Sequence, residues 1–203
     1  MAFQNVKRGF VMEEIDYSNI PLENLAQGLQ STRRRERQDC AHELVVRCSQ
    51  NPEAVVPYIR PLQKSLGCTE AQTRWEALNA LALLAPYDVK SMSKTFRDAE
   101  TCLFDDESAA VRLAACRFLV AYGSQSEKNS DKSWGVLDEF IQCYHGDPEY
   151  RDILKMMLTF AQGHISRKTR AAMEKRFEFD AHNSNGYINK FSVEIIQTLK
   201  QDA

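Results

Sequence analysis

The sequence predicts an all-α fold in which helical hairpins repeat along the chain. Four arginines recur at intervals of 37, 38 and 39 residues: Arg37, Arg74, Arg112 and Arg151. Small or aliphatic residues follow three and seven positions after each arginine, and these positions share one face of a helix. A repeat of this length is typical of helical solenoids, so we predict an α-α superhelix of four to five hairpins.

The first hairpin is predicted between residues 19 and 50. Pro21 suits the first turn of its first helix, and the segment from Arg37 to Cys48 lies on its second helix. Residues 1–18 are predicted to be an arm or a capping segment, and residues 19–203 a single repeat domain.

The second hairpin is predicted at residues 51–86. Asn51 followed by Pro52 is a typical start for its first helix, which is predicted to continue to Leu66. Thr69 and Gln72 have the spacing of a capping box, which predicts the start of its second helix.

The third hairpin is predicted at residues 87–123. Asp88 is suited to cap its first helix. Its second helix is predicted from Ser108 to Tyr122, and Gly123 is expected to end that helix in the left-handed conformation.

The C-terminal third is predicted to hold two further hairpins, at residues 131–163 and 164–203. The polar segment from Ser124 to Lys132 is predicted to be a long mobile loop. Residues 145–148, His-Gly-Asp-Pro, predict the turn inside the fourth hairpin.

Cysteine usage and charge exclude several classes of protein. Cys40, Cys116 and Cys143 fall at apolar helical positions, so we predict small core residues and no disulfide framework. No segment has the length of a signal-peptide core or a membrane span, and we therefore expect a cytoplasmic protein. The formal net charge of −2 argues against a chain that coats nucleic acid through overall charge.

The segments Thr73–Leu81 and Val111–Leu119 resemble HEAT repeats, and the resemblance covers roughly residues 19–162. It implies antiparallel helix pairs stacked into a right-handed superhelix, with the second helix of each pair on the concave side. It implies no catalytic site. An acid is expected six residues before each repeated arginine, but only Asp106 fills that place, so we do not expect a continuous ladder of aspartate and arginine.

The repeated arginines are predicted to make structural hydrogen bonds between helices. The alternative is a row of cations for an anionic partner. One and five positions after each arginine lie residues that share another helical face. We expect this face on the concave surface. The candidates for partner binding on it are Trp75, Asn79, Leu113, Arg117, Asp152 and Met156.

Trp75 and Arg117 are residue types common at interface hot spots. The alternative is that Trp75 covers the adjacent repeat. Two basic clusters are candidate anion-binding sites, with a solvated helix face as the alternative for the second. They are Arg33, Arg34 and Arg35, and then Arg167, Lys168, Arg170, Lys175 and Arg176.

These observations favour a non-catalytic scaffold or adaptor that binds a protein or peptide segment on its concave face. The alternative is a nucleic-acid-binding solenoid, in one version a DNA-repair glycosylase that uses Trp75, Arg117 and Asp152. Cys143 and His145 are the only pair suggestive of a metal or nucleophile site, and burial of Cys143 explains it better. We therefore expect no cofactor, no metal and no enzymatic activity, and the oligomeric state is left open.

Overall fold

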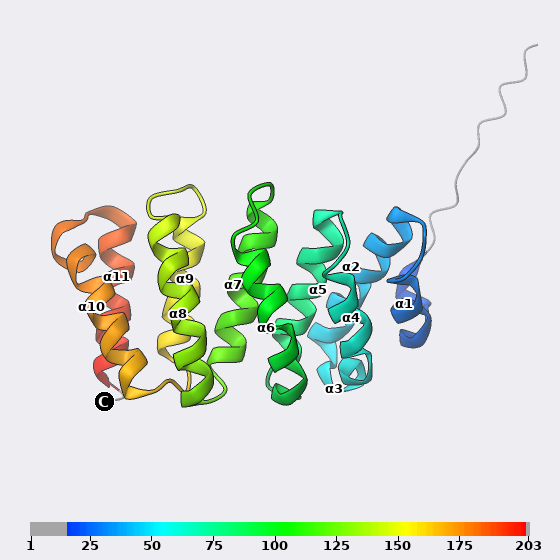
Figure 1. Ribbon diagram of the computed structural model, residues 1–203, viewed down its shortest axis with the longest axis horizontal. Helices are drawn as coiled ribbons and strands as arrows, with labels where there is room; N and C mark the ends of the chain where they lie inside the picture. The colour runs from blue at the N-terminus through cyan, green and yellow to red at the C-terminus, as the bar shows by residue number, and fades with distance from the viewer. Residues whose placement is uncertain (1–15, 202–203) are drawn as a thin grey trace, which may run out of the picture.

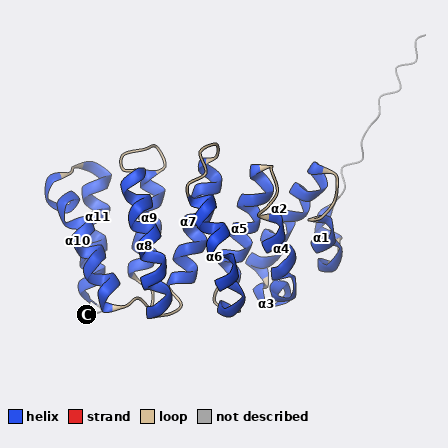
Figure 2. Cartoon of the chain, viewed as in Figure 1, coloured by secondary structure: helices blue, strands red, loops and turns tan. Residues whose placement is uncertain are grey.

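The computed structural model describes residues 16–201, which form helices joined by short turns and contain no strand (Figures 1 and 2). The predicted all-α superhelix is confirmed. Two short 3₁₀ helices and eleven α-helices follow one another: η1 (Tyr17–Asn19), α1 (Leu22–Gly28), α2 (Arg34–Gln50), α3 (Pro52–Val55), η2 (Val56–Tyr58), α4 (Ile59–Ser65), α5 (Ala71–Leu84), α6 (Val89–Leu103), α7 (Ala109–Gly123), α8 (Glu127–Cys143), α9 (Tyr150–Ala161), α10 (Arg167–Asn183) and α11 (Gly186–Gln201).

The helices form two layers. Helices α2, α5, α7, α9 and α11, here called the inner layer, each contact the next member of the series. The outer layer is formed by α1, α4, α6, α8 and α10, and its members contact one another less. Figure 1 shows the pairs side by side, from α1 at the right to α11 at the left. Because the inner helices approach one another more closely, the array curves with the inner layer on its concave side.

Side-chain caps explain where several helices begin. The side chains of Asn51, Asp88 and Ser108 each accept a hydrogen bond from a backbone N–H three residues later, at 3.4, 3.0 and 3.3 Å. Such caps satisfy N–H groups that have no partner within the helix. The predicted starts of these three helices are therefore confirmed.

The outer part of the second hairpin differs from the prediction of one continuous helix. It is divided into α3, η2 and α4, with Pro57 inside η2. Proline has no N–H to donate and its ring crowds the preceding turn, so the α-helical bonding is interrupted there. The capping box is also wrong, because Glu70 is the N-cap residue of α5 and makes no side-chain cap bond. The Thr69 hydroxyl lies 3.4 Å from the Glu70 carboxylate.

The predicted mobile loop at 124–132 is wrong, because α8 begins at Glu127. The Ser126 hydroxyl accepts a hydrogen bond from the Asn129 N–H at 3.3 Å and caps this helix. Ser130 is fully buried, and its hydroxyl donates to the Glu127 carbonyl at 2.7 Å. Since serine can satisfy its hydroxyl within its own helix, a polar sequence forms a buried helix here.

Gly123 is not in the left-handed conformation, so its predicted role is wrong. Among the described glycines only Gly146 and Gly186 have positive φ, at 84° and 60°. Gly123 instead allows close packing of α7. A Cβ at this position would lie 2.7 Å from Cε2 of Phe160 and 2.8 Å from Cβ of Ser133.

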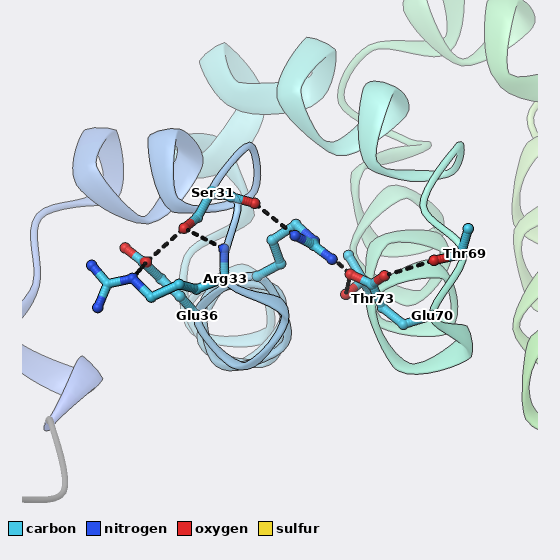
Figure 3. A network of polar contacts seen from close by, with 7 residues as sticks. Ser31, Arg33, Glu36, Thr69, Glu70 and Thr73 are labelled. Carbon is cyan, nitrogen blue, oxygen red and sulfur yellow. Dashed lines mark hydrogen bonds and ion pairs between the residues drawn. The ribbon is translucent and has the colours of Figure 1, made fainter. Parts of the chain in front are cut away.

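Arginine–carboxylate pairs join three successive junctions of the inner layer. Arg37 Nε lies 2.5 Å from Glu70 Oε1, Arg74 Nη1 lies 2.6 Å from Asp105 Oδ2, and Arg112 Nε lies 3.1 Å from Glu149 Oε1. In each pair the acid lies at or just before the start of the next inner helix. Figure 3 shows the first junction, where Glu70 also accepts a hydrogen bond from Thr73 at 3.1 Å.

The structural role predicted for the arginines is confirmed at these three positions. The pairs use both glutamate and aspartate, and none uses an acid six residues before an arginine, so they are not the continuous aspartate and arginine ladder that the sequence argued against. The acids stand four, seven and two residues before the next repeated arginine, so they share no sequence register. Arg151 is exposed and makes no ion pair within residues 16–201. The ladder therefore ends at the fourth inner helix.

Replacing Arg112 by Met tests the structural role of the ladder. Arg112 also donates to the Asp105 carbonyl at 2.7 Å and lies over the Tyr144 ring. Its loss leaves a partly buried carboxylate without a partner, and we expect the free energy of unfolding to fall by roughly 3 kcal/mol. Urea denaturation followed by circular dichroism measures this change.

Arg151→Met is the matched control, because it removes an exposed arginine from the equivalent position of α9. It should change the free energy of unfolding by no more than about 0.5 kcal/mol. Equal losses of unfolding free energy in Arg112→Met and Arg151→Met would contradict the structural role of the ladder.

The first pair predicts an acid-sensitive contribution to stability. The hydrogen bond from Arg37 lowers the pKa of Glu70 from 4.5 to about 2. A carboxyl group with a lowered pKa stabilises the folded chain at pH values above its ordinary pKa. This stabilisation is lost as the pH falls from 4.5 toward 2. The urea midpoint of Glu70→Gln should therefore lie below that of the wild type at neutral pH and fall less over this acid range. If the urea midpoints of the wild type and Glu70→Gln fell in parallel as the pH is lowered, the acid-sensitive stability could not be assigned to the Arg37–Glu70 pair.

Candidate protein-binding surface

The concave stripe consists of the residues one and five positions after the repeated arginines. It lies on α2, α5, α7 and α9 of the inner layer, one pair of residues from each helix. Its members are Gln38 and His42, Trp75 and Asn79, Leu113 and Arg117, and Asp152 and Met156. The fold therefore brings the six sequence-predicted binding candidates onto three successive inner helices.

Polar bonds link neighbouring helices across the stripe. Arg117 Nη1 donates to Asn79 Oδ1 and joins α7 to α5. His42 Nδ1 lies 3.0 Å from Glu76 Oε1 and joins α2 to α5. These bonds hold side chains of the stripe in defined positions at two adjacent junctions.

Three apolar members of the stripe are half-buried. Trp75, Leu113 and Met156 pack against the hydrophobic core and keep part of their surface accessible. The alternative role for Trp75, which is to cover the adjacent repeat, stays a prediction. A half-buried aromatic residue is held rigidly and still offers contact area, which suits an interface anchor.

Two exposed apolar residues, one on α5 and one just after it, were missed in the sequence. Leu83 on α5 is 39% exposed, and Tyr87, just after α5, is 47% exposed. Leu83 lies eight residues after Trp75, so the two share one face of α5. This spacing could have indicated from the sequence that Leu83 is exposed. It was missed because its neighbours along the chain are also aliphatic, so it was not distinguished from core residues. Among the described residues only Phe179, on α10, is another exposed large hydrophobic side chain.

The fourth hairpin makes the stripe more polar. Asp152 is exposed, and its Oδ1 accepts a hydrogen bond from Lys155 Nζ at 2.7 Å. The structure gives Asp152 no bond to Trp75 or Arg117. Direct bonds therefore do not join Trp75, Arg117 and Asp152 into a glycosylase-like site.

The first basic cluster lies at the N-terminal edge of the inner layer. Arg33 Nε lies 3.2 Å from Glu36 Oε2, and Glu36 also accepts a hydrogen bond from Ser31 (Figure 3). Arg35 Nε lies 3.7 Å from Asp39 Oδ2. Arg34 lines a cavity of about 400 Å³ between the starts of α2, α5 and α7. Glu70 and Glu107 also line this cavity, so its charge is mixed.

The second basic cluster is divided by the packing of α10. Arg176 Nη2 donates to Asp138 Oδ2 at 2.9 Å, and Arg170 Nη1 lies 3.5 Å from the Leu199 carbonyl. The remaining members, Arg167, Lys168 and Lys175, are exposed. Two of the five predicted anion-binding residues therefore bond to neighbouring helices.

Cys143 is exposed, so its predicted burial is wrong. It lies at the C-terminal end of α8, where the outer helix leaves the core. His145 Nε2 lies 2.9 Å from Asp180 Oδ2 and so has a partner on α10. Within residues 16–201, no group of three or more histidine, cysteine, aspartate and glutamate side chains could hold a metal ion. No helix of this part of the chain is long and apolar enough to cross a bilayer.

Comparison with solved structures identifies the class of fold. An engineered protein superposes with a TM-score of 0.70 at 18% identity, over 89% of this chain and 79% of its own. A designed armadillo repeat protein in complex with the peptide (KR)4 gives 0.68 at 15% identity, over 88% and 81%. Computationally designed armadillo repeat proteins for modular peptide recognition give 0.69 at 14% identity, over 87% and 81%. The chain has the fold of HEAT- and armadillo-like helical repeat proteins.

No protein-family model matches this sequence, and no curated protein is significantly similar to it.

The thiols are expected to differ sharply in reactivity. Burial raises the pKa of Cys40 and of Cys48 to about 11 and also raises that of Cys116. A thiol reacts as its thiolate and must be accessible, so maleimide should label Cys143 first in the native protein. Intact mass spectrometry follows the number of adducts with time. The fast adduct should disappear in Cys143→Ser; its persistence would contradict the exposure of Cys143.

Proposed function

We propose that this chain is a non-catalytic protein-binding scaffold or adaptor that holds a partner segment on its concave face. The observation that carries the proposal is that α5 presents the exposed Leu83 on the same face as the half-buried Trp75, with the exposed Tyr87 just after the helix. Large apolar side chains cost free energy when they face water, and a partner that covers them recovers it. Arg117 on the adjacent helix adds a polar contact of the kind enriched in hot spots.

The solved structures of similar fold support this use of the surface. Two of them are designed armadillo proteins, one bound to a peptide and one designed for peptide recognition. Their identity to this chain is low, so the support concerns the shape of the scaffold and not its partner. Nucleic-acid binding has weaker support, because Arg170 and Arg176 bond within the chain.

We also propose that this binding takes place in the cytoplasm. All six cysteines are free thiols, and several of them fill core positions. Free thiols of this number suit a reducing compartment, where disulfides are rare.

The proposal predicts that two substitutions on α5 and α7 abolish partner binding. In Leu83→Ser with Arg117→Glu, an exposed apolar contact and an exposed charge change together while the core stays intact. Tagged protein purified from its native cells should lose its specific partners, as measured by quantitative mass spectrometry. Circular dichroism and the melting temperature should match the wild type, because both side chains face solvent. Trp75→Ala with Arg117→Glu should give the same loss.

The control is Phe179→Ala with Arg97→Glu, which changes an exposed aromatic residue and an exposed arginine of the outer layer. It should retain the partners. Unchanged capture by the concave-face variants would contradict the proposed surface. Titrating the protein with duplex DNA over a series of salt concentrations tests the alternative of nucleic-acid binding, since phosphate contacts make affinity fall steeply with ionic strength.

A further inference from the structure

Arg117 is the arginine of the concave stripe, and no carboxylate within residues 16–201 neutralises its charge. It is exposed in the middle of α7, and its Nη1 donates to the neutral amide oxygen of Asn79. Arg37, Arg74 and Arg112, on the same layer, each bond to a carboxylate of the next hairpin. Arg117 therefore differs from the arginines that join the repeats.

Two acids on the inner helices, one of them a member of the stripe, already have partners. Glu76, on α5, lies 3.0 Å from His42 and so faces α2. Asp152, on α9, bonds to Lys155 one turn further along its own helix. Arg117 consequently places a positive charge on the stripe, while Glu76 and Asp152 are engaged with other partners.

Apolar residues hold neighbouring positions on the inner helices. Leu113 lies one turn before Arg117 on α7, and Met156 holds the equivalent position on α9; both are half-buried against the core. Trp75 and Leu83 stand on either side of Asn79 along α5. A partner segment that covers these apolar side chains also excludes water from the guanidinium, which strengthens its bond to an anion of the partner.

We propose that the partner segment carries a carboxylate side chain, with apolar side chains on both sides of it, and that Arg117 binds the carboxylate. This inference rests on the proposed function and specifies its partner by charge complementarity. The planar guanidinium can bind a carboxylate through two parallel hydrogen bonds. The bond to Asn79 holds the guanidinium in place before the partner arrives, which reduces the entropy lost on binding.

Selection from a phage-displayed library of random dodecapeptides tests the inference. Peptides selected on the wild-type protein should be enriched in Asp or Glu flanked by aromatic or aliphatic residues. Arg117→Gln should weaken the selected peptides by about tenfold or more, measured by fluorescence anisotropy. Selection on Arg117→Glu should favour Lys or Arg at the same place. Arg97→Gln, the same charge change on the outer helix α6, should leave affinity unchanged.

The outcomes separate this inference from the proposed function. Peptides without acidic enrichment that still lose affinity for Leu83→Ser would overturn the acidic partner and leave the concave site standing. Selection of the same peptide motif by the wild type and by Arg117→Glu would also overturn the acidic partner and leave the concave site standing. If no peptide is selected, or if selected peptides bind Leu83→Ser and Trp75→Ala unchanged, the concave site and the acidic partner both fail.

Discussion

The hairpins, the arginine–carboxylate pairs and the concave stripe all depend on the stacking of the inner helices against one another. A single hairpin cannot bury its own apolar face, so each is stabilised by the hairpins before and after it. Leu44, Leu81 and Leu119, at equivalent positions of α2, α5 and α7, are fully buried between the layers. The arginine–carboxylate pairs cross the same junctions and fix how far each helix slides along the next. The apolar contacts supply stability, and the paired charges specify the register.

Close stacking also determines which residues can bind a partner. The junctions are narrow because small residues occupy them: Ala77, Ala80, Ala114 and Ala115 are almost completely buried. When so much of an inner helix is covered, only positions about one turn apart still face the concave side. On α5 these positions hold Trp75, Asn79 and Leu83. The surface available for binding is thus a consequence of the packing that stabilises the fold.

Arg112 and Arg117, on the same helix, have different roles for an electrostatic reason. Arg112 is mostly buried, and a charge in that position is tolerated because Glu149 accepts its hydrogen bonds. Arg117, five residues later, is exposed and meets only a neutral amide. Water stabilises its charge in the free chain, so it remains available for a partner.

The sequence by itself determined the period, the hairpins and most helix starts, because these depend on local capping and on helical spacing. It also identified the face that carries Trp75 and Arg117, since residues four apart on a helix share one side. Only the tertiary structure decided which acid pairs with each arginine, because Glu70, Asp105 and Glu149 come from different registers of the next hairpin. The burial of Ser130, the exposure of Cys143 and the close packing at Gly123 depend in the same way on a neighbouring helix. Spacing within one helix carries no information about the residues that another helix places against it.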